Sequence, residues 1–219
     1  MKGEKYMKKI TKSIQIFLVL IFMLSFSQTC LALIKPEQYK DRVTIFYSDF
    51  EDKDDSMWQN DADKSRLVEV DSGKNIAYQV YNYDYLKVPN IDTLVDFRVE
   101  FNYRFKLKTP GENWPAFYLK SRGQPSRYEL YFESKPGAEA IELKKSLQGK
   151  VKSVPYDVSA INNKWVYIKI DITGDKLTCY INDKEKPAFE YQDDDPIDCG
   201  PLGFVKGGCA GNYVDNLLV

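Results

Sequence analysis

Arg127, Glu129, Tyr131 and Glu133 occupy alternate positions of one short segment, and the residues between them are apolar or aromatic. Because successive side chains of a β-strand point to opposite faces, this pattern predicts a strand with one face toward a core and one toward solvent. Paired carboxylates that flank a bond carry out the acid and base steps of glycoside hydrolysis. Glu129 and Glu133 place two carboxylates on the predicted solvent face of this strand.

The spacing of these two glutamates limits that chemistry. On a straight strand their α-carbons would lie roughly 13 Å apart. Carboxyl groups lie about 5 Å apart in retaining glycosidases and roughly 6.5 to 9.5 Å apart in inverting ones. Two side chains leaning inward could reach the inverting range, whereas the retaining range would need a bulge. The alternatives are a face that contacts a ligand without cleaving it and a face that is only solvated.

A sugar-binding site without catalysis needs flat aromatic faces and planar polar groups. The predicted ligand-binding residues are Trp114, Tyr118, Arg122, Arg127, Glu129 and Tyr131. Trp114 lies in a predicted loop, where an exposed indole is costly unless it packs or binds something. The alternative for Trp114 is that it caps the core.

The predicted site depends on three segments, residues 116–121, 127–133 and 140–145, being neighbouring strands of one sheet. Their shared open face would then carry Tyr118, Lys120, Arg122, Glu129, Tyr131, Glu133, Glu142 and Lys144. A further strand could extend this face with Arg98, Glu100, Asn102 and Arg104. Four tyrosines upstream, Tyr78, Tyr81, Tyr83 and Tyr85, are typical of sheet edges, because tyrosine is apolar at one end and hydrogen-bonds at the other.

The composition excludes several classes of enzyme and partner. The chain has 219 residues and 0 His, which rules out histidine-dependent serine and cysteine triads, histidine-ligated zinc and histidine general bases. Any catalysis would have to use carboxylates, Tyr, Lys, Arg or Cys. A net charge of -1 provides no basic field, and this disfavours nucleic acid and anionic membranes as partners.

Two acidic clusters could hold calcium, which prefers hard oxygen ligands. One contains Asp49 and Glu51, and pairing of the first and last strands would bring Asp215 beside them; the other spans residues 193–198. Neither has the spacing of an EF-hand, and solvated turns are the alternative. No cofactor is required by the predicted function.

The cysteines of the chain fall into two groups. Cys179 lies on the apolar side of its predicted strand, so we expect it to be a small core residue. Cys199 and Cys209 flank a predicted short strand and could form a disulfide in an oxidising compartment.

Residues 1–32 have the organisation of a secretory signal peptide. Five lysines precede an uninterrupted apolar run over residues 17–24, and Cys30, Leu31 and Ala32 fit a cleavage site. A lipidated Cys30 and an uncleaved membrane anchor are the alternatives. Each places residues 33–219 outside the cytoplasm, secreted or on the extracellular face of the cell envelope. That length suits a single domain.

The elements that must position these residues are all strands. Residues 166–172 alternate, Gly174 supplies a turn and residues 177–182 run back, which predicts a hairpin in the closing half of a β-sandwich. Residues 97–108 alternate throughout, and no segment has a long 3.6-residue apolar period. The predicted class is all-β, a two-sheet antiparallel sandwich. Residues 43–51 are expected to form a strand beside the C-terminal one and so cover a sheet edge.

Several short stretches together resemble the concanavalin A-like jelly rolls. They are Asp49-Phe50-Glu51 followed by Trp58, the Trp165 hairpin, Gly203-Phe204, and Val214-Asp215-Asn216 near the end. Within that group, the stretches are most similar to laminin-G-like domains and 3-keto-disaccharide hydrolase-type domains. The resemblance implies a jelly-roll sandwich that binds or cleaves glycans. Glu129 and Glu133 also resemble the two glutamates on the catalytic strand of family 16 glycoside hydrolases, with Tyr131 standing where that family has an aspartate. This resemblance makes Glu129 and Glu133 the candidate catalytic residues.

These observations favour an extracytoplasmic, bacterial carbohydrate-binding domain that does not cleave its glycan. The first alternative is a glycoside hydrolase that uses Glu129 and Glu133. The second is a structural surface module without a small ligand. Because unrelated activities share this fold, the site must decide among them.

Overall fold

The structure is a computed structural model that describes residues 44–59, 66–81, 83–87, 90–109, 111, 115–120, 127–146 and 148–219. The predicted signal peptide and the predicted site residues Trp114 and Arg122 lie outside these residues. Within the described ranges, no helix is long and apolar enough to cross a membrane.

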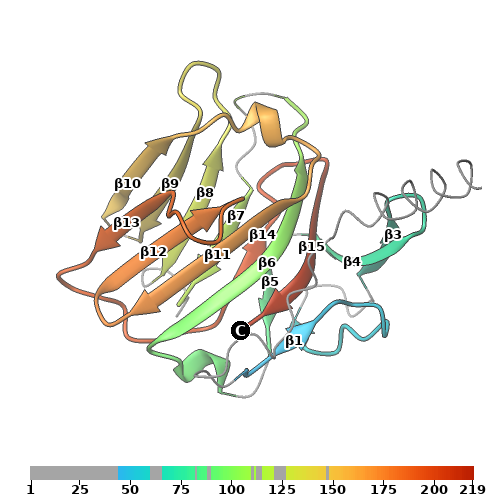
Figure 1. The fold of residues 1–219 in the computed structure, drawn as a ribbon, viewed down its shortest axis with the longest axis horizontal. Coiled ribbons are helices and arrows are strands. Elements are labelled where there is room, and N and C mark those ends of the chain that lie inside the picture. The colour runs from blue at the N-terminus through green and yellow to red at the C-terminus, as the bar shows by residue number, and fades with distance from the viewer. Residues whose placement is uncertain are drawn as a thin grey trace, which may run out of the picture. The chain divides into compact units, whose positions relative to one another are not determined.

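Two antiparallel sheets form a sandwich (Figure 1). Sheet A has eight strands, in the order β13 (Phe189–Gln192), β12 (Lys176–Ile181), β11 (Val166–Thr173), β6 (Phe97–Lys106), β15 (Gly211–Leu218), β4 (Asn75–Val80) and β3 (Leu67–Val70), with β1 (Tyr47–Ser48) also pairing with β15. Sheet B has seven, in the order β10 (Gly149–Pro155), β9 (Ala140–Lys145), β8 (Tyr128–Glu133), β7 (Ala116–Leu119), β14 (Gly203–Val205), β5 (Tyr83–Leu86) and β2 (Trp58–Gln59). Two short 3-10 helices, η2 (Ile91–Thr93) and η3 (Ser159–Ile161), complete the described elements. The predicted all-β sandwich is confirmed.

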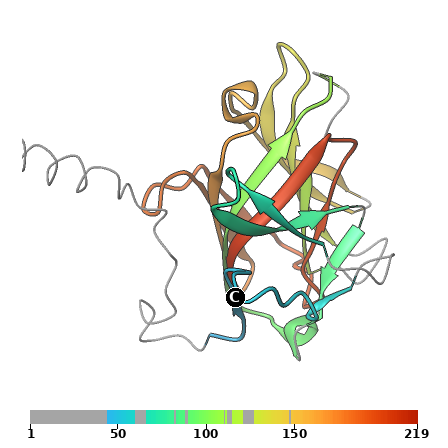
Figure 2. The same cartoon turned by 90° about the vertical axis from the view of Figure 1, so that its right-hand side faces the viewer.

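Local sequence patterns explain the longest strands of sheet A. The alternation along β6 places Val99, Phe101 and Tyr103 in the core. The predicted hairpin is formed by β11 and β12, and Gly174 in its turn has a φ of 58°, which glycine adopts without steric cost. The predicted pairing of the first and last strands is also confirmed within the described residues, since Tyr47 of β1 lies opposite Leu218 of β15. Figure 2 shows the blue N-terminal strand beside the C-terminus.

The last two strands, β14 and β15, belong to different sheets. β14 lies in sheet B between β7 and β5, whereas β15 lies in sheet A between β6 and β4. The closing half of the chain therefore completes both layers. In particular, β14 joins β5, which comes early in the chain, to the strands that carry the predicted site.

Aromatic residues from both sheets fill the space between the layers. Phe101 of sheet A contacts Phe117 and Phe204 of sheet B, with ring centroids 4.8 Å and 5.1 Å away. Trp58 of β2 stacks on Tyr78 of β4 at 4.2 Å. Truncating such a core ring typically costs about 3–5 kcal/mol of stability.

A buried ion pair fixes the connection between β13 and β14 to sheet B. Asp193, the first residue of the acidic cluster at residues 193–198, is buried and accepts from the Lys145 Nζ at 3.1 Å and from the Tyr128 hydroxyl. The backbone N–H of Ile197 donates to the Tyr128 hydroxyl at 3.1 Å. The expectation of a solvated or calcium-binding turn is therefore wrong at Asp193, because a lysine and a tyrosine of sheet B occupy its carboxylate.

One of the two predictions about the cysteines is confirmed. Cys179 is fully buried in the core, as predicted. Cys209 is a buried free thiol, so the structure does not contain the suggested disulfide between Cys199 and Cys209.

Candidate functional site

Strand register aligns the residues on the outer face of sheet B in two rows. The first row, from β5 to β10, is Tyr85, Gly203, Tyr118, Glu129, Lys144 and Lys150. The second is Tyr83, Val205, Ala116, Tyr131, Glu142 and Ser153. The alternate residues, among them Phe117, Leu130 and Leu143, belong to the core. We call the two rows the open face.

The open face has an aromatic end over β5, β14 and β7. Ala116, Val205 and Tyr118 form a small apolar cluster separate from the main core, and Tyr85 and Tyr131 pack against it. Tyr83, which is 40% exposed, stacks on Tyr118 with ring centroids 6.1 Å apart. Aromatic faces on the outside of a sheet are the surfaces that contact the apolar side of a sugar ring.

Gly203 makes room for the aromatic end. A Cβ at this position would lie 2.7 Å from the Cδ1 of Tyr85 and 2.9 Å from the carbonyl oxygen of Asp84. Such distances are too short for carbon atoms, so only glycine allows the Tyr85 ring to lie against β14. Glycine in a strand often marks such a close approach.

Two charged groups, Arg127 just before β8 and Glu129 on it, are held in place by their neighbours. The Arg127 guanidinium lies over the Tyr118 ring, 4.3 Å from its centroid, and its Nε donates to the Glu129 carboxylate. Burial raises the pKa of Tyr131, and a hydrogen bond with Glu129 raises it further. Glu129 itself is only 7% exposed. This arrangement presents a fixed guanidinium and a fixed carboxylate beside the tyrosines.

The far end of the open face, over β9 and β10, carries two lysines. Lys150 Nζ donates to Glu142 Oε1 at 2.6 Å, and this hydrogen bond raises the pKa of Lys150. Lys144 Nζ lies 3.7 Å from the other oxygen of Glu142 and 3.6 Å from the centroid of the Tyr131 ring. The aromatic and charged ends therefore meet at Tyr131.

The structure alters the roles expected of several predicted residues. Tyr118 is 1% exposed, because Tyr83 and Arg127 lie on it, so its ring supports the surface and does not offer a face to a ligand. Lys120 is equally buried, at the end of β7 with a φ of 50°, and does not join the open face. Tyr83 and Tyr85 do join it, although the sequence suggested only edge positions for them. Their alternation with Asp84 was the signal that could have identified them.

The glutamates proposed as a catalytic pair are engaged separately. Glu129 interacts with Arg127 and Tyr131, whereas Glu133 accepts from the backbone N–H of Lys135 at 3.0 Å, in the turn that follows its own strand. Their strand partners also differ, since Glu129 lies opposite Lys144 and Glu133 opposite Ala140. Nothing in this geometry directs the two carboxylates toward one bond.

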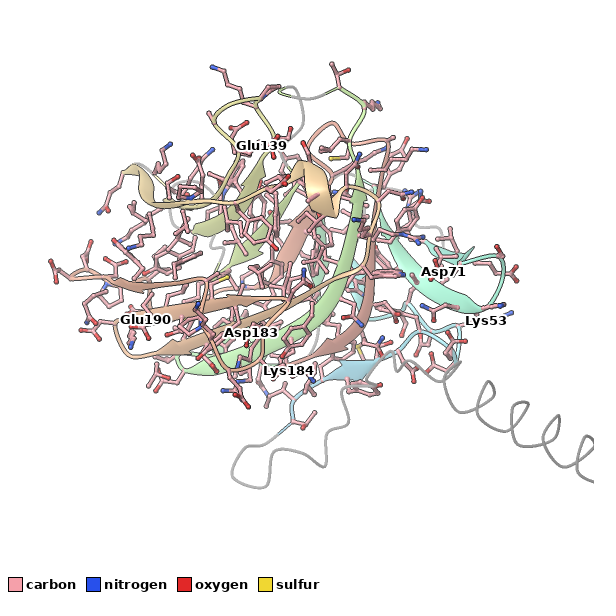
Figure 3. All side chains as sticks on the ribbon, turned by 45° about the horizontal axis from the view of Figure 1, so that its top comes forward. Lys53, Asp71, Glu139, Asp183, Lys184 and Glu190 are labelled. Carbon is pink, nitrogen blue, oxygen red and sulfur yellow. The ribbon has the colours of Figure 1, made fainter. Side chains whose placement is uncertain are left out.

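The residues expected to extend the open face lie on the other sheet. Arg98, Glu100, Asn102 and Arg104 belong to β6 of sheet A. There Arg98 forms two hydrogen bonds with Asp171, at 2.6 Å and 2.8 Å. Arg104 binds Asp71 at 2.7 Å, and Asp71 lies at the β3–β4 end of the sheet, far from Glu190 on β13 (Figure 3). This prediction was wrong because strand order, which the sequence pattern does not reveal, places β6 in sheet A.

The three candidate calcium ligands lie near enough to interact electrostatically, but they are not arranged around a metal site. Burial raises the pKa of Asp215 to about 6, and the nearby negative charges of Glu51 and Asp49 add to that rise. Hydrogen bonds already engage all three carboxylates. Asn75 Nδ2 donates to Asp215 at 2.8 Å, the Ile76 N–H donates to Glu51 at 2.9 Å, and the Glu51 N–H donates to Asp49 at 3.3 Å. The part of the chain that the structure describes contains no group of three or more acidic or cysteine residues arranged to hold a metal ion.

Comparison with protein-family models and with curated protein sequences finds no match. Solved structures do match. The carbohydrate-binding module CBM66 from Bacillus subtilis is 15% identical, over 74% of this chain and 93% of that one, with a TM-score of 0.51. A β-glucanase from Bacillus licheniformis is 12% identical, over 82% of this chain and 98% of that one, with a TM-score of 0.53. The exoplasmic/lumenal domain of VIP36, in a form bound to Ca2+ and Man3GlcNAc, is 8% identical, over 80% of this chain and 86% of that one, with a TM-score of 0.53.

The described strands and these similarities define the class: the protein has a concanavalin A-like jelly-roll fold, as the sequence resemblance implied. At such identities the likeness establishes the fold, and the function must be argued from the site.

Proposed function

We propose that the protein is a secreted carbohydrate-binding domain that holds a glycan on the open face of sheet B without cleaving it. The aromatic end of that face carries the proposal. Tyr85 and Tyr131 pack against an apolar cluster outside the main core, and the exposed Tyr83 ring stacks beside them on Tyr118. A soluble sheet has no structural need for a second apolar cluster on its solvent side, so a ligand is the better explanation.

The charged neighbours of these rings supply the polar half of a sugar site. Arg127 and Glu129 are fixed by each other and by the tyrosines before any ligand arrives. Fixed groups lose little conformational entropy on binding, which raises affinity for a polar ligand. The guanidinium of Arg127 can donate to sugar hydroxyls, and the carboxylate of Glu129 can accept from them.

The similar solved structures also support the proposal of glycan binding. They include a carbohydrate-binding module and a domain bound to a mannose-containing glycan, and both share the jelly-roll fold. A β-glucanase with this fold keeps hydrolysis as the competing candidate. The separate engagement of Glu129 and Glu133 favours binding, because a hydrolase must direct both carboxylates at one glycosidic bond.

A glycan array probed with the full chain tests this proposal, with reducing-sugar release followed on every glycan that binds. We expect binding without release, and we expect Glu133→Gln to leave that binding intact. Release of reducing ends that Glu133→Gln abolishes would establish the hydrolase instead. Failure to bind any glycan would favour a structural surface module.

The same proposal includes export. Residues 1–32 would be removed as a signal peptide, so N-terminal sequencing of the protein recovered from a secreting host should begin near Leu33. Recovery of the intact N-terminus in a membrane fraction would identify an uncleaved anchor.

A further inference from the structure

We infer that the glycan held on the open face is anionic, and that its carboxylate or sulfate groups bind at Lys144 and Lys150. This inference rests on the proposed function and specifies the class of ligand. Lys144 of β9 and Lys150 of β10 lie directly opposite each other in the register of the two strands. Like charges at opposed positions of an antiparallel pair destabilise a sheet.

Both lysines lie close to a single carboxylate, that of Glu142. Glu142 Oε1 lies 2.6 Å from Lys150 Nζ, and its Oε2 lies 3.7 Å from Lys144 Nζ. The shorter contact is a hydrogen bond, and the longer one is only an electrostatic contact. Glu133 also acts electrostatically on Lys150, but its carboxylate accepts from the backbone N–H of Lys135. The close ion pairs of the two ammonium groups are therefore with the one carboxylate of Glu142.

The two lysine side chains are more exposed than the carboxylate that pairs with them. The side chains of Lys150 and Lys144 are 53% and 31% exposed, whereas the side chain of Glu142 is 7% exposed. Glu129, the other acidic group in the middle of the two rows, is similarly buried and is bound to Arg127. A molecule approaching the open face over these lysines therefore meets their ammonium groups before the buried carboxylates of Glu142 and Glu129.

The lysines also lie where a glycan seated on the tyrosines would reach them. Lys144 Nζ is 3.6 Å from the centroid of the Tyr131 ring, at the boundary of the aromatic end. Neighbouring strands are about 4.8 Å apart, so Lys150 lies about one strand spacing further along the row. One glycan chain could thus contact the tyrosines through its sugar rings and the lysines through its anionic groups.

Edge protection is the competing explanation, since β10 is the last strand of sheet B and lysines on edge strands discourage aggregation. That role needs one lysine on the edge and does not need a second opposite it on β9. It also predicts no effect of either lysine on binding. The two explanations therefore differ in what a substitution should do.

The test uses two pairs of polymers that share a backbone and differ in charge. Binding of the full chain is measured by titration calorimetry with polygalacturonate and its methyl ester, and with dextran sulfate and dextran. We expect binding to at least one anionic member of a pair, weaker or absent binding to its neutral partner, and loss of affinity as salt is added. Comparison of the two anionic polymers distinguishes a carboxylate ligand from a sulfate ligand.

The variants Lys144→Gln and Lys150→Gln should each weaken binding to the anionic polymer by roughly tenfold, the size expected for one charge-assisted hydrogen bond. Lys176→Gln is the matched control, because Lys176 is an exposed lysine paired with Glu190 at 2.8 Å on sheet A. An equal loss in the control would show diffuse attraction and overturn the site. Equal binding of charged and neutral polymers would overturn the inference and leave the proposed function intact. Glycan binding absent from both these polymers and the array would overturn the proposed function itself.

Discussion

The exposed ring of Tyr83 stacks on the buried ring of Tyr118, with centroids 6.1 Å apart. The guanidinium of Arg127 covers Tyr118 as well, 4.3 Å from its centroid. Tyr118 is thus the support on which a partly exposed aromatic ring and a fixed cation rest. Because Tyr83 comes from β5 and Arg127 immediately precedes β8, the stack joins distant parts of the chain into one surface.

Gly203→Ala should destabilise the protein by about 1–3 kcal/mol, the usual cost of adding atoms where there is no space. The added Cβ would meet the Tyr85 ring at 2.7 Å and the backbone of Asp84 at 2.9 Å. Urea denaturation measures the change. Combining the variant with Tyr85→Ala should recover only part of the loss, since the contact with the Asp84 carbonyl remains. Unchanged stability in the single variant would show that Tyr85 does not lie against β14.

Lys145→Ala should cost about 3–5 kcal/mol, because it leaves the Asp193 carboxylate buried without its cation. Lys176→Ala removes an exposed ion pair of similar length and should change stability by less than about 1 kcal/mol. Urea denaturation of both variants provides the comparison. Similar small losses in the two would mean that the ion pair between Lys145 and Asp193 is not buried in solution.

Asp215 should make stability depend on pH in a direction opposite to that of most carboxylates. Its pKa is about 6 in the folded protein and 3.8 in its ordinary state, so the protonated form favours folding. This contribution is complete below pH 3.8 and is lost as the pH rises to 6. The difference corresponds to about 3 kcal/mol.

The variant Asp215→Asn isolates this effect. Its stability relative to the unsubstituted protein should rise by about 3 kcal/mol between pH 3.8 and 7, as measured by urea denaturation at each pH. A difference that stays constant across this range would contradict the raised pKa. Because hydrogen bonds already engage the carboxylates of Asp215, Glu51 and Asp49, we expect EDTA and added calcium to leave both profiles unchanged.

Features that depend on local periodicity could be predicted from the sequence. The alternation at residues 127–133 correctly placed Leu130 and Phe132 in the core and Glu129 and Tyr131 on the open face. The turn at Gly174 and the pairing of β1 with β15 were also correct. The alternation of apolar and polar side chains along a strand depends only on neighbouring residues, so it can be recognised without knowledge of the tertiary fold.

Features that depend on strand order could not be predicted. Tyr83 and Tyr85 reach the site only because β14, more than a hundred residues later in the chain, pairs with β5 on one side and β7 on the other. The acidic cluster at Asp193 gave no sign that Lys145 would neutralise it. Tyr118 was expected to contact a ligand, and the stacking of Tyr83 and Arg127 on its ring buries it instead.

The most direct test of glycan binding on the open face is titration calorimetry of the glycan identified on the array with the full chain and its Tyr83→Ala variant. Loss of an exposed stacking ring should weaken binding by roughly tenfold, about 1.4 kcal/mol, with stability changed by less than about 1 kcal/mol. Tyr180→Ala is the matched control, because Tyr180 is a partly exposed tyrosine on β12 of sheet A. Unchanged affinity in Tyr83→Ala, or an equal loss in Tyr180→Ala, would show that the glycan does not bind on the open face.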